Sequence, residues 1–252
     1  MRLAFSRSVR KMNKVAIIGG SRFKELENFA ITHSTSVNTP YGQPSSPLYY
    51  GIIGEQEVVF LPRRGSEAPM APHRINYRAN IWALRDAGVQ TVLATAAVAG
   101  IAEQLVSGAL VVPDQLIDYT YDRENTFFGD DSVVSRIDFS QPYCEVLREK
   151  ICIHAKRLKL SLYHDMTYGI TQGPRFETLA EIKRLKNDGC QLVGMTGMPE
   201  ATLARELELD YATIAIVIRQ AGQYVKSAES EKLVSNGEAA LSNLIESIIT
   251  AQ

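Results

Sequence analysis

Short apolar runs alternate with helical patterns along almost the whole chain, and this alternation constrains the fold more than any other feature. Residues 15–18, 89–101 and 211–219 have the continuous apolar character of buried strands, and further strand-like runs lie within residues 108–120, 164–176 and 191–195. Helical spacing recurs between the strand-like runs, at residues 75–88, 140–158, 177–189, 199–209 and 238–251. Because parallel strands are usually joined by helical crossovers, the pattern predicts an α/β fold with a mostly parallel sheet and helices on both faces.

The domain organisation expected from this pattern is simple. Residues 48–63 contain two strand-like runs joined by a glycine-containing turn, which predicts a β-hairpin. No internal repeat, low-complexity segment or linker rich in Pro, Gly or Ser divides the sequence. We therefore expect one domain over residues 13–252. Residues 1–12 are expected to be an N-terminal extension, and Met12, immediately before the first strand, is a candidate for the natural start.

The composition argues against several classes of partner. The 252 residues carry a formal net charge of −1, which gives no electrostatic reason to expect nucleic acid or an acidic membrane. No apolar run approaches the roughly 20 residues needed to span a bilayer. Neither the histidines nor Cys144, Cys152 and Cys190 have metal-like spacing, so we expect no metal. The cysteine usage suits a reducing compartment, and cytoplasm is the expected location.

Anion-binding residue types follow three of the predicted strands. "GGSRF" (19–23) offers backbone N–H groups and the Ser21 hydroxyl, "LPRRGSE" (61–67) offers two guanidinium groups, and "MTG" (195–197) offers the Thr196 hydroxyl. A plain tight turn is the alternative for the first segment, and solvated surface arginines are the alternative for the second. If the three strand ends meet, their side chains can surround one tetrahedral oxyanion, because ligands bind at the carboxyl ends of strands in α/β sheets.

Longer motifs resemble one family. "TPYGQPSSPL", "LPRRG", "PHRINYRANIWALRDAGV", "DQLIDYT", "QGPRFETLAEI" and "GMTGMPEATLARELELDYA" look like the purine nucleoside phosphorylases, and the match is closest to the methylthioadenosine and methylthioinosine phosphorylase branch. This resemblance implies one α/β domain with a mixed, barrel-like central sheet flanked by helices, assembled as a homotrimer. It also implies no cofactor other than inorganic phosphate as co-substrate, which displaces a purine from C1′ of a nucleoside.

The resemblance also implies roles for individual residues. Phosphate would be bound by residues at the strand ends, namely Ser21, Arg63, Arg64, Ala96 and Thr196. The nucleoside would be bound by Met195 under the ribose, Phe176 stacked on the purine, Glu177 beside it, and a purine-reading loop of Arg219, Gln220 and Ala221. Arg136 stands where a neighbouring subunit usually contributes a histidine to the 5′-pocket. Ala96 stands where a threonine or serine is usual, so the phosphate site lacks one hydroxyl.

Arg219 is the candidate for discrimination and catalysis at the purine. The family usually has acidic residues in this loop for 6-aminopurines, or asparagine for 6-oxopurines, whereas this chain has Arg219 and Ala221. An arginine fork matches the O6 and N7 acceptors of a 6-oxopurine and would oppose an N6 amino group. We therefore expect a 6-oxopurine substrate, and methylthioinosine fits best, giving hypoxanthine and 5-methylthioribose 1-phosphate for purine salvage. Two alternatives stay open: a purine-binding homologue without turnover, and a methylthioadenosine phosphorylase.

Overall fold

The strands of this protein form one mixed sheet, seen in a computed structural model that describes residues 14–20, 29–65, 69–128, 136–224 and 227–251. The expected N-terminal extension, together with Ser21, lies outside these ranges. In the described residues the strands are β1 (Lys14–Gly19), β2 (Ala30–Thr35), β3 (Leu48–Ile53), β4 (Gln56–Pro62), β5 (Val89–Gly100), β6 (Leu110–Val112), β7 (Gln115–Tyr119), β8 (Leu162–His164), β9 (Thr167–Thr171), β10 (Leu192–Gly194) and β11 (Asp210–Gln220).

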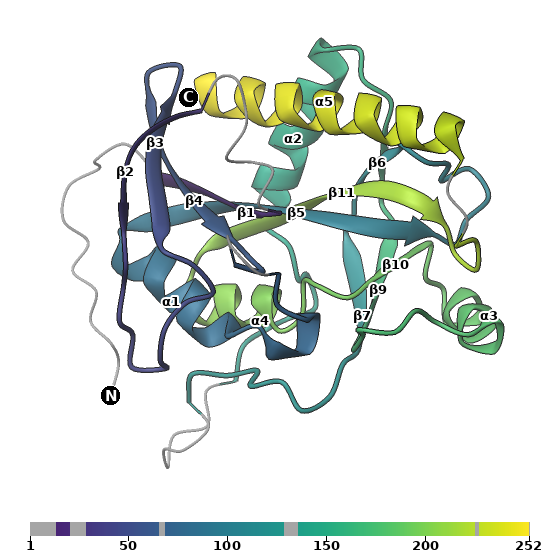
Figure 1. Cartoon of the computed structure of the whole chain (residues 1–252), viewed down its shortest axis with the longest axis horizontal. Coiled ribbons are helices and arrows are strands. Elements are labelled where there is room, and N and C mark those ends of the chain that lie inside the picture. The colour runs from purple at the N-terminus through teal and green to yellow at the C-terminus, as the bar shows by residue number, and fades with distance from the viewer. Residues whose placement is uncertain (1–13, 21–28, 66–68, 129–135, 225–226, 252) are drawn as a thin grey trace.

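The sheet is organised around β5, the longest of these strands. Its main path runs in the order β2-β3-β4-β1-β5-β10-β9-β7, while β11 pairs with β5 and leads to β6 and β8. The pairs β1–β4, β1–β5 and β5–β11 are parallel, whereas β3–β4 and β5–β10 are antiparallel. In Figure 1, β7, β9 and β10 run across the direction of β5 and β11. The predicted mixed sheet and the hairpin at residues 48–63 are therefore present.

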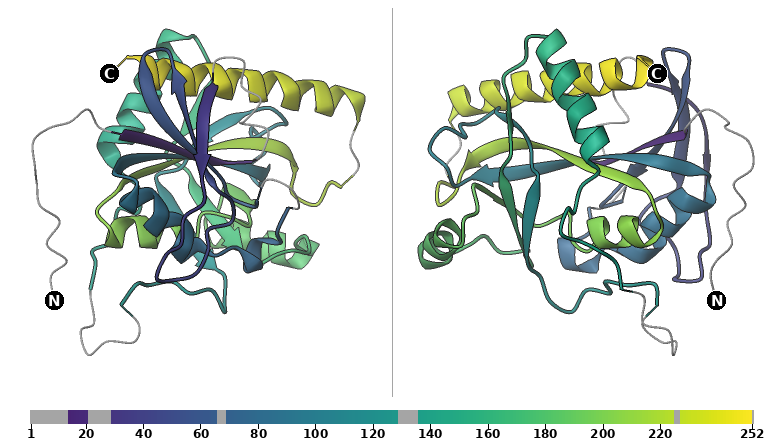
Figure 2. Two further views of the ribbon diagram at one scale, coloured as in Figure 1. Left: turned by 60° about the vertical axis from the view of Figure 1, so that its left-hand side comes forward. Right: turned by 180° about the vertical axis from the view of Figure 1, so that it is seen from behind.

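Helices cover both faces of the sheet, as predicted. They are α1 (Tyr77–Asp86), α2 (Glu145–Arg157), α3 (Leu179–Asn187), α4 (Glu200–Glu206) and α5 (Ala228–Thr250), with a short 3-10 turn at Pro72–Arg74. Figure 2 shows α2 and α5 on one side of the strands and α1 and α4 on the other, with α3 at one end. Each layer has its own cluster of buried apolar side chains, one containing Ile81 and Leu203 and the other containing Ile151 and Leu244.

Local signals explain where several helices begin. The Thr178 side chain accepts from the Glu181 N–H and the Glu181 side chain accepts from the Thr178 N–H, so a capping box starts α3. A similar exchange between Ser227 and Ser230 starts α5 at residue 228, ten residues before the predicted start. The prediction was wrong there because the first turns of α5 are polar and lack an apolar stripe. Among the described helices, none is long and apolar enough to cross a membrane.

β2 was missed entirely, and β8 was not separated from the strand predicted within residues 164–176. β2 has all six residues exposed and pairs only with β3 in the described part of the sheet, as the first strand of the path. Its sequence, "AITHST", has neither the apolar run of a buried strand nor a face that meets the core. β2 forms because its backbone pairs with β3 and not because its side chains are buried, so its sequence contains no strand pattern.

Candidate active site

The carboxyl-terminal half of β5 brings the predicted phosphate-binding segments together. Across β1 and β5, Ile18 lies opposite Ala94, so Gly19 and Gly20 come next to Thr95 and Ala96. The backbone N–H of Arg63, directly after β4, donates to the Gly19 carbonyl at 2.9 Å. The ends of β1 and β4 therefore meet beside the middle of β5, as the sequence predicted for parallel neighbours.

The other half of the candidate site lies further along the same strand. β10 is antiparallel to β5 with Val193 opposite Ala99, so the turn that follows β10 runs back toward Ala96. On the opposite side of β5, Arg219 of β11 pairs with Ala99 and Gln220 pairs with Gly100. The step from Ala96 to Ala99 is roughly 10 Å at 3.3 Å per residue. Predicted phosphate-binding and purine-binding segments thus flank one stretch of strand.

Arg63 is buried in an ion pair that the sequence did not reveal. It is 4% exposed, and its Nε and Nη2 donate to the two carboxylate oxygens of Glu200 at 2.7 and 2.8 Å. Nη1 donates to the Thr95 carbonyl at 2.6 Å, and the Tyr211 hydroxyl donates to Glu200 at 2.8 Å. Burial alone would lower the pKa of Arg63, but the Glu200 carboxylate raises it overall. Of the five guanidinium N–H groups, these bonds leave two for an anion.

Tyr168 connects Arg63 with the turn after β10. Its buried hydroxyl would lie 2.5 Å from a Cβ added at Gly194, so glycine there lets the phenol reach the turn. Burial raises the pKa of Tyr168 to about 12, and the nearby Thr196 and Arg63 act in the opposite direction. Thr196 lies near enough to the hydroxyl to influence its pKa, although the hydroxyl has no hydrogen bond of standard geometry. Arg63, Tyr168 and Thr196 therefore occupy one neighbourhood at the strand ends.

The remaining predicted phosphate residues have different surroundings. Arg64 is exposed, and its Nε donates to the Met70 carbonyl at 2.6 Å. Ala96 is 5% exposed and presents only a methyl group. Arg136, predicted for the neighbouring subunit's 5′-pocket, is exposed in the segment before α2. Ser21 follows β1 but lies outside the described residues.

The predicted purine face is occupied by the Arg219 side chain. Phe176 is 53% exposed and stacks on Tyr224, with ring centroids 5.1 Å apart and an interplanar angle of 26°. The guanidinium carbon of Arg219 lies 4.2 Å from the Phe176 centroid and 5.0 Å from the Tyr224 centroid. A guanidinium over an aromatic face is held by the ring quadrupole. Arg219 thus lies on the ring expected to stack against a purine.

Hydrogen bonds fix the rest of the purine-side residues. Glu177 is only 6% exposed, and it accepts from the Thr171 hydroxyl at 2.7 Å. The Gln220 amide donates to the Leu105 carbonyl at 2.6 Å, and the Ala221 N–H donates to the Gly100 carbonyl at 2.8 Å. These bonds tie the 219–221 loop to the end of β5.

Met195 packs against the turn that precedes Phe176. Its sulfur would lie 2.6 Å from a Cβ added at Gly173, whose φ of +62° also favours glycine. Met195 itself is partly exposed, beside Thr196. The thioether therefore sits between the predicted phosphate and purine segments, where the resemblance expects the ribose.

Several residues of this region were missed by sequence reasoning. Glu200 reads as an ordinary acidic residue in the first turn of a helix, and 137 positions separate it from Arg63. Tyr224 follows a polar loop and gives no stacking signal. Arg123 lies in "DYTYDREN" among other charged and polar residues. For all three, the partner is distant in sequence or unpatterned, so only the fold reveals the contact.

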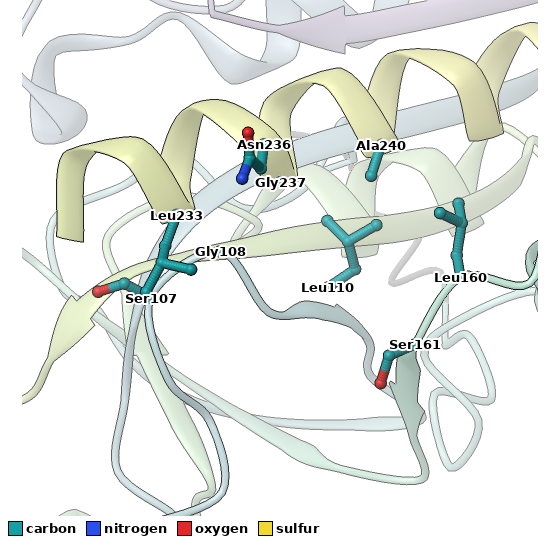
Figure 3. A pocket seen from close by; sticks show the side chains of 9 residues that line it. All are labelled: Ser107, Gly108, Leu110, Leu160, Ser161, Leu233, Asn236, Gly237 and Ala240. Atoms are coloured by element: carbon teal, nitrogen blue, oxygen red, sulfur yellow. The ribbon is translucent and has the colours of Figure 1, made fainter. Parts of the chain in front are cut away.

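A separate cavity lies on the other side of the sheet. It measures about 230 Å³ and is formed by α5 with β6 and its neighbouring loops (Figure 3). Its lining contains no charged side chain: Ser107, Gly108, Leu110, Leu160, Ser161, Leu233, Asn236, Gly237 and Ala240. Leu110 belongs to the apolar cluster under α5, whereas Ala96 belongs to the cluster under α4. An uncharged lining on the α5 face does not suit phosphate, so we do not assign this cavity to the reaction. In the described part of the chain, no group of acidic, histidine and cysteine side chains could hold a metal ion.

Comparison with curated proteins finds relatives that are named as phosphorylases. A protein named probable S-methyl-5'-thioinosine phosphorylase from Pseudomonas syringae pv. tomato is 44% identical over 245 residues, covering 95% of this chain and 100% of that protein. A protein named 6-oxopurine nucleoside phosphorylase from Pyrococcus furiosus is 43% identical over 218 residues, covering 83% of this chain and 80% of that protein.

Solved structures and a family model agree with these relatives. A methylthioadenosine phosphorylase from an antarctic soil metagenomic library superimposes with a TM-score of 0.89 at 31% identity, covering 95% of this chain and 86% of that chain. A methylthioadenosine phosphorylase from Schistosoma mansoni gives 0.88 at 32% identity, covering 95% and 91%. The family model described as "Phosphorylase superfamily" matches residues 14–250. With nearly its whole described length matched in this way, the chain belongs to the phosphorylase superfamily.

Proposed function

We propose that this protein catalyses the phosphorolysis of a 6-oxopurine nucleoside. S-methyl-5'-thioinosine is the substrate that we put first, with hypoxanthine and 5-methylthioribose 1-phosphate as products. The observation that carries the proposal is the arrangement along β5, with Arg63 and Thr196 near Ala96 and Arg219 with Phe176 near Ala99. Relatives named for S-methyl-5'-thioinosine and for 6-oxopurine nucleosides support the substrate class.

Phosphate, in this proposal, binds between the ends of β1, β4 and β10. Arg63 would offer its two remaining N–H groups, Thr196 its hydroxyl, and the Ser21 segment its backbone, with Arg64 at the rim. Because Glu200 already neutralises Arg63, and Ala96 has no hydroxyl, we expect weak phosphate affinity. Inorganic phosphate is the only co-substrate that we propose, with no metal and no organic cofactor.

The purine would bind at the Phe176 end of the site. Phe176 would stack on the base after the Arg219 guanidinium, whose carbon lies 4.2 Å from the ring centroid, moves off that face. Glu177 would lie beside the base, and Gln220 and Ala221 would border it. The Arg219 fork would donate to O6 and N7, since arginine donates hydrogen bonds but does not give up a proton near neutral pH. Met195 would lie under the ribose between the two ends.

The chemistry follows from these positions. The bond from C1′ to the purine nitrogen breaks with oxocarbenium character, and a phosphate oxygen forms the new bond to C1′. The bonding electrons leave with the purine, which takes a proton from solvent after departure. Donors aimed at the base stabilise that developing negative charge, and the bound phosphate dianion stabilises the sugar cation. No side chain needs to form a covalent intermediate.

Assembly and location complete the proposal. We propose a homotrimer, in which the exposed Arg136 of one subunit lies near the 5′-pocket of another, and a cytoplasmic location. Nucleic acid and membranes are not proposed as partners, which is consistent with the net charge of −1.

The test is phosphate-dependent release of hypoxanthine from S-methyl-5'-thioinosine and from inosine, with methylthioadenosine as the competing substrate. We expect hypoxanthine release that stops when phosphate is omitted, and little adenine release. Faster adenine release would contradict the assigned base class.

Binding without turnover is the second candidate function, and the methyl group at Ala96 favours it. Hypoxanthine binding with no release from any nucleoside would select that candidate over phosphorolysis.

A further inference from the structure

Arg123, between β7 and α2, contacts two turns that are far apart in the sequence. On one side, its Nη2 donates to the Gln172 carbonyl at 2.9 Å and its Nε donates to the Gln172 side-chain oxygen at 3.0 Å. On the other side, Nη2 donates to the Met195 carbonyl at 3.1 Å and Nη1 donates to the Met198 carbonyl at 2.5 Å. One guanidinium therefore joins the turn after β9 to the turn after β10.

The remaining contacts use the rest of its donors. Nη1 also donates to the Tyr77 hydroxyl at 3.3 Å, and Nη2 lies 3.3 Å from the Thr171 carbonyl. A guanidinium has five N–H groups, and these six contacts employ all of them, with one N–H shared between two acceptors. Every acceptor recorded for Arg123 in the described ranges is uncharged. Arg123 therefore joins separate segments through neutral acceptors, whereas Arg63 forms an ion pair with Glu200.

The two turns joined by Arg123 carry the residues proposed to bind substrate. Gln172 leads directly to Gly173, against which Met195 packs, and then to Phe176 and Glu177. The Met195 carbonyl lies immediately before Thr196. A shift of either turn would therefore change the spacing between the purine-stacking ring and the phosphate-binding hydroxyl.

We propose that Arg123 is a positioning residue for phosphorolysis, which sets the Phe176 turn and the Met195–Thr196 turn at the separation that the nucleoside and phosphate require. The inference rests on the proposed function for its kinetic consequence. Its structural consequence, the mutual ordering of the two turns, holds whatever the substrate is.

Substituting Arg123 with lysine or with glutamine distinguishes the effect of the guanidinium's shape from the effect of its charge. Arg123→Lys keeps the positive charge, but its single ammonium cannot reach acceptors in both turns as the planar fork does. Arg123→Gln removes both charge and fork. Arg78 provides the matched control, because it lies in α1, pairs with Glu124 at 3.3 Å and stacks over Tyr41 at 5.1 Å, with no recorded contact to either turn in the described residues.

Two measurements test the proposal on wild type, Arg123→Lys, Arg123→Gln and Arg78→Gln. The first is kcat and both KM values per folded molecule, with folding monitored by thermal unfolding. We expect kcat to fall about 100-fold in both Arg123 variants, the scale of loss when reacting groups are misplaced by about 1 Å, and to stay near wild type in Arg78→Gln. The second is amide hydrogen exchange without ligand, where residues 172–177 and 194–198 should both exchange faster in the Arg123 variants alone.

The outcomes distinguish failure of the proposed function from failure of the positioning role of Arg123. If wild type releases no purine, the proposed function fails, and hydrogen exchange still decides whether Arg123 orders the turns. Wild-type kcat in Arg123→Lys would mean that the guanidinium fork is not needed and would overturn the proposal. Unchanged exchange in both turns would also overturn it. If both Arg123 variants fail to fold while Arg78→Gln folds, Arg123 is a general folding residue and the positioning role is rejected.

Discussion

Replacing Glu200 with glutamine tests whether the buried pair with Arg63 has the energetic consequence that its geometry implies. Both side chains are almost fully enclosed, at 5% and 0% exposure. Removing one partner leaves the other charge buried and uncompensated, which typically costs about 3–5 kcal/mol. For a domain of this size, 1 kcal/mol corresponds to roughly 2–4 °C in Tm, so we expect Tm to fall by about 6–20 °C.

The chain offers a close control for this experiment. Arg175 and Glu181 also form a two-bond pair, with Nη1 and Nη2 donating at 2.8 and 2.7 Å, but their side chains are 67% and 41% exposed. Exposed pairs contribute at most about 1 kcal/mol, so Glu181→Gln should lower Tm by no more than about 4 °C. Glutamine also preserves the capping box with Thr178, which removes helix capping as a confounding cause.

Thermal unfolding at one protein concentration, with and without inorganic phosphate, is the assay. Phosphate should raise the Tm of Glu200→Gln more than that of wild type, because an anion beside Arg63 would replace the missing carboxylate. Equal losses for Glu200→Gln and Glu181→Gln would refute the reasoning, since burial would then have no effect on the cost. Equal phosphate shifts would show that phosphate does not reach Arg63.

Three further outcomes are expected. Arg63→Lys keeps a charge beside Glu200 but loses the fork, so calorimetry should show phosphate binding weakened by about 1.5–3 kcal/mol, against about 0.5–1.5 kcal/mol for Thr196→Ala; the reverse order would remove Arg63 from the phosphate site. Ala96→Ser restores a hydroxyl and should tighten phosphate by about 0.5–1.5 kcal/mol in the same titration, and no change would place that side chain out of reach. Hypoxanthine should bind better than adenine by about 1–3 kcal/mol, and Arg219→Ala should abolish the difference; identical base affinities in the two proteins would mean that Arg219 does not read the purine.

The order of strands and helices could be predicted because buried strands and helices have characteristic apolar patterns in the sequence. The runs at residues 15–18 and 211–219 became β1 and β11, and residues 75–88 became α1. β2 and the first turns of α5 have no such pattern, because their residues are largely polar and exposed.

The candidate site was predictable only where residues lie next to strand ends. Arg63 directly follows β4 and Thr196 is the second residue after β10, so their position came from the strand pattern. The pairing of Arg63 with Glu200 and the contacts of Arg123 join segments that tertiary packing alone brings together. Arg219 illustrates the limit: its place at the end of β11 was predictable, but its stacking on Phe176 and Tyr224 depends on two separate loops.

The continuous pairing of β5 with its neighbours has a consequence for how such a protein can diversify. Ala96 and Ala99 both belong to β5, and β11 accommodates one extra residue between them, because Val217 lies opposite Val98 and Arg219 lies opposite Ala99. An insertion or deletion in β5 itself at this point would turn the side chains that follow it in β5 to the opposite face. Changes in substrate preference are therefore confined to substitutions in place and to the loops that follow the strands. Libraries aimed at new nucleoside preferences should randomise residues 172–177 and 219–224 and leave the length of residues 94–100 untouched.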